Sequence, residues 1–199
     1  MRDDTQPDWS EVKNIMNPFE RIASRYHGLP DVDLTQGKSI AYSRSTTTRI
    51  MELIDANSQG NVHGGAIMRM VDEAAAIVAI KHSQRPFVVT ARVDRFDFLA
   101  PAFIGDVVSV HCEMHYVGRT SMEVGVEVTA EDLITREVRK IASSNVIYVA
   151  LDESRKPTSV PPLVPADTTE AETIERARKR RVRRQKLDEE ARLEAKEGQ

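Results

Sequence analysis

The sequence predicts an α+β fold in which a curved, five-stranded antiparallel sheet wraps around one long central helix, with helical extensions at both ends. Two observations lead to this prediction. A polar, glycine-containing loop runs directly into a mostly apolar helical segment at residues 65–82, and four strand-like segments follow without another helical pattern between them. A β-branched segment before the loop adds a fifth strand, and this order is typical of α+β domains.

Length and composition limit the chain to one domain with extensions. It has 199 residues, of which 40% are apolar, enough for one core but not for two. The net charge of −3 averages a basic cluster near the C-terminus against acids elsewhere, so it does not single out a class of partner. Cys112 is the only cysteine, which excludes a disulfide framework and a cysteine zinc site.

The sequence shows no targeting or membrane signal. The chain starts with charged residues, so we expect no secretory signal, and its longest apolar run, residues 74–80, is too short to cross a bilayer. Together with the single cysteine, these features favour a cytoplasmic protein that does not bind membranes.

The chain before the helix divides into two parts. Residues 1–38 are predicted to form an N-terminal helical extension, in which Asn17, Pro18 and Gly28 hold the cap, first-turn and stop positions of a helix. This extension lacks the second, basic helix that a DNA-reading helix-turn-helix needs. Residues 40–54, with a Ser-Thr-Thr-Thr run, are predicted to form the first strand.

The loop before the helix is the first candidate site. Gly64 and Gly65 let a ligand approach the backbone closely, and the first N–H groups of the helix lack partners within the helix. Such a helix start attracts a carbonyl oxygen that gains negative charge. His63 precedes the two glycines, and we expect it to shape the turn rather than to act as a base, because no orienting partner is visible.

The helix at residues 65–82 has apolar residues around most of its circumference and is therefore predicted to be buried. Arg69, Asp72 and Glu73 fall in one narrow stripe on the side of Gly65. We expect Asp72 to be poorly solvated there and to be a stronger base for that reason. In the alternative, Asp72 and Glu73 face a solvated edge or pair with Arg69.

The remaining strands are predicted at residues 87–98, 108–116, 122–128 and 138–150. The first of them changes the face of its apolar residues near Arg95, which predicts a β-bulge. A five-stranded sheet around one helix has open edges and leaves part of the helix uncovered. We therefore expect a symmetric dimer that joins two sheet edges.

Two patterns have competing interpretations. His111, Glu113 and His115 alternate on one strand face, but a solvent-facing strand gives the same pattern, so we expect no metal site. A proline-rich linker at residues 153–167 precedes a charged C-terminal helix at residues 168–199 with eight Lys or Arg between Arg176 and Lys186. That helix is either solvated, an oligomer contact or a source of cations for a phosphate-bearing ligand. Nucleic-acid binding is disfavoured because no aromatic residues interleave.

An ordered set of short motifs lies between residues 39 and 152. The motifs are Asp55-Ala-Asn57, Gly60-Asn61-Val-His63-Gly64-Gly65, Met70-Val-Asp72-Glu73, Ala91-Arg-Val-Asp94, Phe98-Leu-Ala-Pro101, Gly105-Asp106-Val and Val117-Gly-Arg-Thr-Ser121-Met-Glu-Val124. In this order they resemble the cytosolic acyl-CoA thioesterase (acyl-CoA hydrolase) family of hotdog-fold proteins. Residues 1–38 depart from the shorter members of that family.

The resemblance implies hydrolysis of an acyl-CoA to a free acid and coenzyme A, with no metal or organic cofactor. It assigns catalysis to Asn57 and Asp72, with Asn61 as the second choice for the amide. It also implies hexamers built as trimers of dimers. The substrate-binding residues it implies are His63, Gly64, Gly65 and, near coenzyme A, Gly118, Arg119, Thr120 and Ser121.

The physical interpretation is a water-activating carboxylate beside an oxyanion site. We expect Asp72 to deprotonate or orient the water, the Gly65 N–H to polarise the thioester carbonyl, and Asn57 to polarise the same carbonyl or to hold the water. Asp72 lies ~10 Å along the helix axis from Gly65, so we predict that two chains share each site. Arg119 and the tail cations are expected to contact phosphates. The alternatives are a phenylacetyl-CoA type of hotdog thioesterase and a non-catalytic acyl-CoA sensor.

Overall fold

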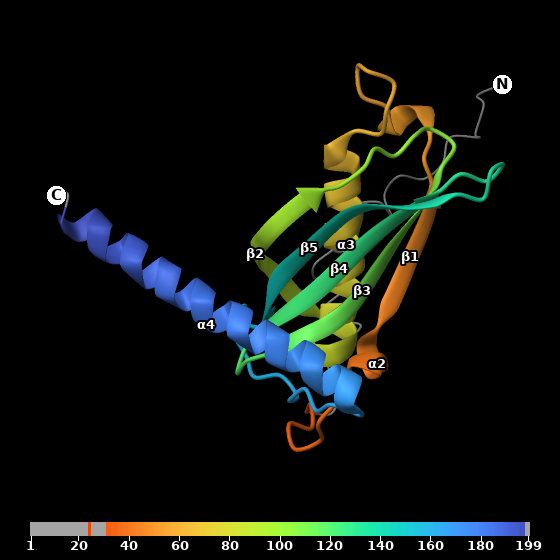
Figure 1. Ribbon diagram of the computed structural model, residues 1–199. Coiled ribbons are helices and arrows are strands. Elements are labelled where there is room, and N and C mark those ends of the chain that lie inside the picture. Colours follow the sequence, from red (N-terminus) through yellow and green to blue (C-terminus); the bar gives the residue numbers. More distant parts are fainter. Residues whose placement is uncertain (1–23, 25–30, 198–199) are drawn as a thin grey trace, which may run out of the picture. The chain divides into compact units, whose positions relative to one another are not determined.

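The computed structural model describes residue 24 and residues 31–197 (Figure 1). Most of the predicted N-terminal extension, including the helix expected between Asn17 and Gly28, lies outside the described residues, apart from Ser24. From residue 40 onward the elements are α2 (Ile40–Ser43), β1 (Ser45–Ile50), η2 (Leu53–Asp55), α3 (Gly64–Ser83), β2 (Phe87–Phe98), β3 (Val107–Val117), β4 (Ser121–Glu131), β5 (Val138–Leu151) and α4 (Thr168–Glu197).

The five strands form one antiparallel sheet in the order β1-β3-β4-β5-β2, and α3 packs against its inner face (Figure 1). Alternate residues of the strands point towards α3, as the period-two pattern predicts. This is the hotdog arrangement, and it confirms the predicted fold class. The buried residues that join sheet and helix include Val108, Val110, Met114, Met122, Val124, Val128, Val146 and Tyr148 from the sheet and Ile67, Met70, Val71, Ala74, Ala75 and Val78 from α3.

Two bulges bend β2. The pairing register with β5 shifts between Asp94 and Phe96, where Arg95 has a φ of 49°, and this confirms the predicted bulge. A second shift, between Thr90 and Arg92, was not predicted, because neither residue interrupts the apolar pattern. Bulges increase the local twist of a strand, so β2 curves over α3.

The first predicted strand is wrong at both ends. Only Ser45–Ile50 pairs as a strand, while Ile40–Ser43 forms the short helix α2. The reason is a distant contact: the buried carboxylate of Glu170 accepts hydrogen bonds from the N–H groups of Ile40 and Ala41, at 3.1 and 3.0 Å. A carboxylate at this position satisfies the N–H groups that start a helical turn.

Among the described residues, none covers one face of α3. Met68, Ile77 and Ile80 are each at least 40% exposed, and so are Val89 and Val93 of the edge strand β2. The expectation that α3 is buried around most of its circumference is therefore wrong for the single chain. Exposed apolar residues that gather on one face indicate an interaction surface.

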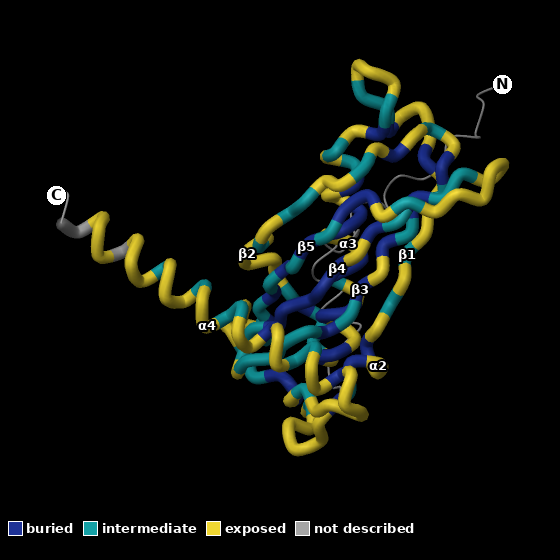
Figure 2. The backbone as a smooth tube through the Cα atoms, viewed as in Figure 1, coloured by how far each residue is buried: buried dark blue, intermediate teal, exposed yellow. Residues whose placement is uncertain are grey.

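The C-terminal helix α4 docks on the outer face of the sheet. Ala177 is fully buried, and Glu123 of β4, only 1% exposed, pairs with Arg180 at 2.8 Å and Arg184 at 3.0 Å. Beyond this contact α4 is largely exposed (Figure 2). No helix of the described part is both long and apolar enough to span a membrane.

Candidate active site

The loop between η2 and α3 is fixed at its start by Asp55. This carboxylate is buried and accepts hydrogen bonds from Arg49 at 2.5 Å and from the N–H of Glu52 at 3.0 Å. Burial would raise the pKa of Asp55, but the Glu52 N–H and the Arg49 charge outweigh it and hold the pKa below its ordinary value. The backbone carbonyl of Asp55 accepts the N–H of His63 at 2.7 Å, so both ends of the loop are joined.

Asn57 stabilises the loop through its carboxamide oxygen, and its carboxamide NH₂ group stays available to a ligand. Its Oδ1 accepts the N–H groups of Gln59 at 2.8 Å and Asn61 at 3.2 Å. Among the described residues, its Nδ2 group has no acceptor. Asn57 therefore offers a hydrogen-bond donor, which suits a carbonyl oxygen better than an attacking water.

The start of α3 differs from the prediction at one atom. His63 caps the helix, and its Nδ1 accepts the N–H of Gly65 at 2.9 Å, which agrees with the expected role of His63 in shaping the turn. The Gly65 N–H is therefore already paired, and the expectation that it polarises a carbonyl is wrong. The N–H of Gly64 has no acceptor among the described residues, so it is the donor that remains at the helix start.

Asn57 and Gly64 open into one pocket of about 250 Å³. Its wall is mostly apolar, as expected for a site that receives an acyl chain. A Cβ added to Gly64 would stand 3.1 Å from Cζ of Phe98, so glycine permits the close packing of α3 on the end of β2. The pocket is lined by Asn57, Asn61, Val62, Gly64, Ile67, Phe98, Ala100, Pro101, Ala102 and Ile141.

Asp72 lies on the uncovered face of α3 and is exposed in the single chain, so the expected poor solvation is wrong there. Its Oδ1 accepts hydrogen bonds from the hydroxyl of Thr90 at 2.6 Å and from that of Tyr148 at 3.2 Å. The alternative pairing with Arg69 holds for Glu73, which pairs with Arg69 at 2.9 Å, but not for Asp72. No Lys or Arg of the described chain forms an ion pair with Asp72.

Sequence reasoning missed Thr90 and Tyr148 as candidate site residues, because threonine and tyrosine are common in ordinary strands. Tyr148 is buried, and its hydroxyl also donates to the backbone carbonyl of Asp72 at 2.8 Å. Burial, followed by the charge of Asp72, raises the pKa of Tyr148, so this hydroxyl stays protonated and donates. Two neutral donors therefore orient Asp72 without neutralising it.

The predicted coenzyme A contacts, residues 118–121, lie near the start of β2, whereas the pocket of Asn57 and Gly64 lies at its end. Residues 118–121 form a tight turn in which the N–H of Gly118 donates to the carbonyl of Ser121 at 2.7 Å. Ser121 pairs with Val149 of β5, which pairs in turn with Val89 near the start of β2. The turn thus flanks the start of β2.

A single chain does not bring the predicted residues together. The pocket of Asn57 and Gly64 lies at Phe98, the end of β2, whereas Asp72 is bonded to Thr90, near its start. Eight residues separate Thr90 from Phe98, roughly 26 Å along an extended strand. Asp72 does not line the pocket.

His111 and His115 have separate partners in the structure. The described residues contain no group of three or more His, Cys, Asp or Glu side chains placed to bind a metal. His115 contacts Glu113 at 3.3 Å, whereas His111 contacts the hydroxyl of Thr46 at 3.2 Å.

Comparisons with known proteins point to one family. The family model of the Thioesterase superfamily matches residues 59–136. The human cytosolic acyl coenzyme A thioester hydrolase is 40% identical over 59% of this chain, but the chain spans only 33% of that protein's length. The uncharacterized acyl-CoA thioester hydrolase YkhA of Bacillus subtilis is 37% identical over 69% of this chain and 81% of its own length.

Solved structures agree with these relatives. An apo-hexameric acyl-CoA thioesterase matches with a TM-score of 0.73 and 37% identity, over 77% of this chain and 97% of that one. An acyl-CoA hydrolase of Staphylococcus aureus, in complex with butyryl coenzyme A, coenzyme A and coenzyme A disulfide, matches with a TM-score of 0.72 and 34% identity, over 79% and 96%. The Staphylococcus enzyme has also been solved with an aspartate, an asparagine or a threonine replaced by alanine. From its fold, its loop-and-helix motifs and these relatives, the chain belongs to the acyl-CoA thioester hydrolase family of hotdog-fold proteins.

Proposed function

We propose that the protein hydrolyses acyl-CoA thioesters to a carboxylic acid and coenzyme A. The observation that supports this most strongly is Asp72, a carboxylate on the uncovered face of α3 that accepts hydrogen bonds from two hydroxyls and forms no ion pair with a described Lys or Arg. A binding protein has no need of such a base. The proposed reaction requires neither a metal nor an organic cofactor.

The proposed chemistry uses water as the nucleophile. Asp72 takes a proton from the water as it attacks the thioester carbonyl. The carbonyl oxygen becomes an oxyanion and accepts hydrogen bonds from the Gly64 N–H and the Nδ2 group of Asn57. When the tetrahedral intermediate collapses, the carbon–sulfur bond breaks, and coenzyme A leaves as a thiol after it receives the proton from Asp72. Thr90 and Tyr148 keep Asp72 aimed at the water.

We propose that two chains share each site by joining their β2 edges antiparallel. In that pairing the start of one β2 lies beside the end of the other. Asp72, bonded to Thr90 near the start, then comes to the Phe98 end of the partner, where Asn57 and Gly64 line the pocket. The exposed apolar residues of α3 and β2 would be buried in the same contact.

The same pairing suggests where coenzyme A lies. The turn at residues 118–121 flanks the start of β2, so it also comes to the pocket of the partner. We assign the acyl chain to the pocket of one subunit and coenzyme A to the turn of the other. Following the hexameric relative, we propose a trimer of such dimers, and following the human relative, a cytoplasmic location.

The variants of the Staphylococcus enzyme support the choice of residues. Its replaced asparagine precedes the replaced aspartate by 15 positions, the same interval as between Asn57 and Asp72. Its replaced threonine follows the aspartate by 17 positions, one fewer than between Asp72 and Thr90. One additional residue between Asp72 and Thr90 in this chain would account for that difference.

Release of free thiol from palmitoyl-CoA tests the activity. We expect hydrolysis by the unmodified protein and its loss in Asp72→Asn; tight binding without thiol release would instead make the protein a sensor. Co-expressed Asp72→Asn and Asn57→Ala chains test the shared site. Random dimers of the two should recover about a quarter of the activity, since half are mixed and each mixed dimer has one intact site of two. No recovery would refute the shared site.

A further inference from the structure

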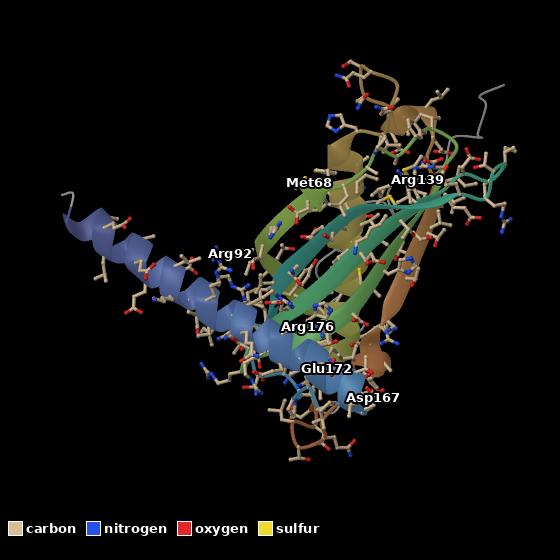
Figure 3. All side chains as sticks on the ribbon, viewed as in Figure 1. Met68, Arg92, Arg139, Asp167, Glu172 and Arg176 are labelled. Atoms are coloured by element: carbon tan, nitrogen blue, oxygen red, sulfur yellow. The ribbon has the colours of Figure 1, made fainter. Side chains whose placement is uncertain are left out.

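The C-terminal helix α4 extends past the edge strand β2 of the sheet on which it docks (Figure 1). Arg184 of α4 pairs with Asp94 of β2 at 2.6 Å, and Asp188 pairs with Arg92 of β2 at 2.8 Å. Figure 3 shows Arg92 where α4 passes this edge strand. The helix then continues to Glu197, nine residues or roughly 14 Å past its last contact with the sheet (Figure 1).

Two successive segments of α4 carry opposite charge, and we call them the basic half (residues 176–186) and the acidic half (residues 188–197). Residues 176–186 have eight basic residues and no acid. Residues 188–197 have five acids and two basic residues, a net charge of −3. The change of sign falls where the helix crosses β2, so the half over the sheet is basic and the half beyond it is acidic.

Several of these charges have no ion-pair partner among the described residues. In the basic half, Lys179, Arg181 and Arg183 have no carboxylate within 4.0 Å among the described residues, whereas the other five cations are paired. In the acidic half, neither Glu189 nor Glu194 pairs with a described cation. The unpaired cations and the unpaired acids lie on opposite sides of the crossing point.

We propose that the α4 helices of two subunits pair antiparallel across the β2 edge, the acidic half of each against the basic half of the other. This inference rests on the proposed β2 dimer. A two-fold axis beside β2 reverses the partner's helix, so that its halves meet the opposite halves of this one. Both helices lie on the same outer face, because the joined sheet is continuous.

A second copy of this chain is the partner that best fits the acidic half of α4. Its surface complements α4 in charge. Arg183 lies five residues before Asp188, where α4 crosses β2, and Glu194 lies six residues after it. In an antiparallel pair, Arg183 of each helix therefore comes close to Glu194 of the other. Leu187 and Leu193, each 55% exposed, would be partly covered by the same contact. A helix half left alone in water would be marginal, since isolated short helices are unstable.

Amide hydrogen exchange of the intact protein, with its molar mass from light scattering, tests the pairing. The variants are Arg183→Glu, Glu194→Arg and the double variant, which reverses both charges and keeps them complementary between antiparallel helices. Arg176→Glu is the matched control. It makes the same charge change at a cation paired within its own helix and farther from the crossing point.

We expect residues 189–197 to be protected in the unmodified protein and in Arg176→Glu. Each single reversal should speed their exchange about tenfold, and the double variant should restore protection. Free exchange of residues 189–197 in a dimer or larger assembly would overturn the pairing, and so would protection that survives both single reversals. A monomeric mass would overturn the proposed assembly and the pairing with it, whereas hydrolysis is judged separately by Asp72→Asn.

Discussion

The hydroxyl of Tyr148 offers a sharp test of how Asp72 is held. Tyr148→Phe removes one oxygen atom from a buried ring and leaves its apolar packing unchanged. The lost hydroxyl donates to the carbonyl of Asp72 at 2.8 Å and to its Oδ1 at 3.2 Å. Asp72 would then keep Thr90 as its only hydroxyl donor among the described residues.

The size of the effect follows from these contacts. A hydrogen bond to a charged group contributes about 1.5–3 kcal/mol, or roughly 10–150-fold in rate if the whole effect appears in the transition state. The bond from Tyr148 to Oδ1 is the longer of the two, and Thr90 remains, so we expect kcat to fall about tenfold with KM unchanged. The loss of folding stability should be near 1 kcal/mol.

Steady-state hydrolysis of palmitoyl-CoA, with thermal unfolding in parallel, measures both quantities. Thr90→Val removes the other hydroxyl without changing the side-chain shape, and the double variant should approach Asp72→Asn. Tyr42→Phe makes the same change at an exposed ring that does not contact Asp72 and should leave kcat unchanged. If kcat stays within about twofold in both Tyr148→Phe and Thr90→Val, the two hydroxyls do not position the base.

Three further variants test packing and buried charge outside the proposed site. His82 is fully buried, which lowers its pKa to about 4. The unfolded chain therefore binds this proton first, and denaturant titrations should show stability falling by up to about 3 kcal/mol from pH 6.5 to pH 4, a dependence that His82→Gln removes. Glu123→Ala removes the buried carboxylate that pairs with Arg180 and Arg184, while Arg184 keeps Asp94, and should cost about 1.5–3 kcal/mol in thermal unfolding, with faster proteolysis of α4. In Gly125→Ala the new Cβ would lie 1.7 Å from the His115 ring, so we expect a loss of about 1–3 kcal/mol that His115→Ala largely restores.

Each of these three outcomes has a clear contrary result. Equal acid sensitivity of the unmodified protein and His82→Gln would show that another group dominates the pH dependence. A Glu123→Ala protein as stable as the unmodified one would mean that desolvation of the charged cluster offsets its attraction. Additive losses in the Gly125→Ala, His115→Ala double variant would show that the two positions do not share space.

The fold was predictable because its signals are local. The alternation of β3 and β4, the apolar pattern of α3 and the change of face at Arg95 each occupy a few consecutive residues. The short helix α2 was not predictable in this way, because the carboxylate that caps it belongs to Glu170. The docking of α4 was missed for the same reason: Arg180 and its partner Glu123 lie 57 residues apart.

The residue types of the site could be predicted from the sequence, but the hydrogen bonds between them could not. Asn57 and Asp72 stand out as polar residues in a glycine loop and an apolar helix, and they remain the proposed catalytic pair. The side chain of His63 decides which N–H at the helix start is available to a ligand, because its Nδ1 accepts the N–H of Gly65. Thr90 and Tyr148 become recognisable only once the sheet brings them to Asp72.

The contact between Glu170 and α2 has a consequence for how the chain is made. Residues 130 positions apart must meet before the first turn of the domain is capped. The segment around Pro162 closes the same corner, since its carbonyl accepts the N–H of Lys38 at 2.9 Å. A nascent polypeptide released only as far as residue 152 has all five strands, but it cannot form the contacts that Pro162 and Glu170 make with residues 38–41. Synthesis of the linker and the start of α4 therefore has to finish before the domain reaches its final stability on the ribosome.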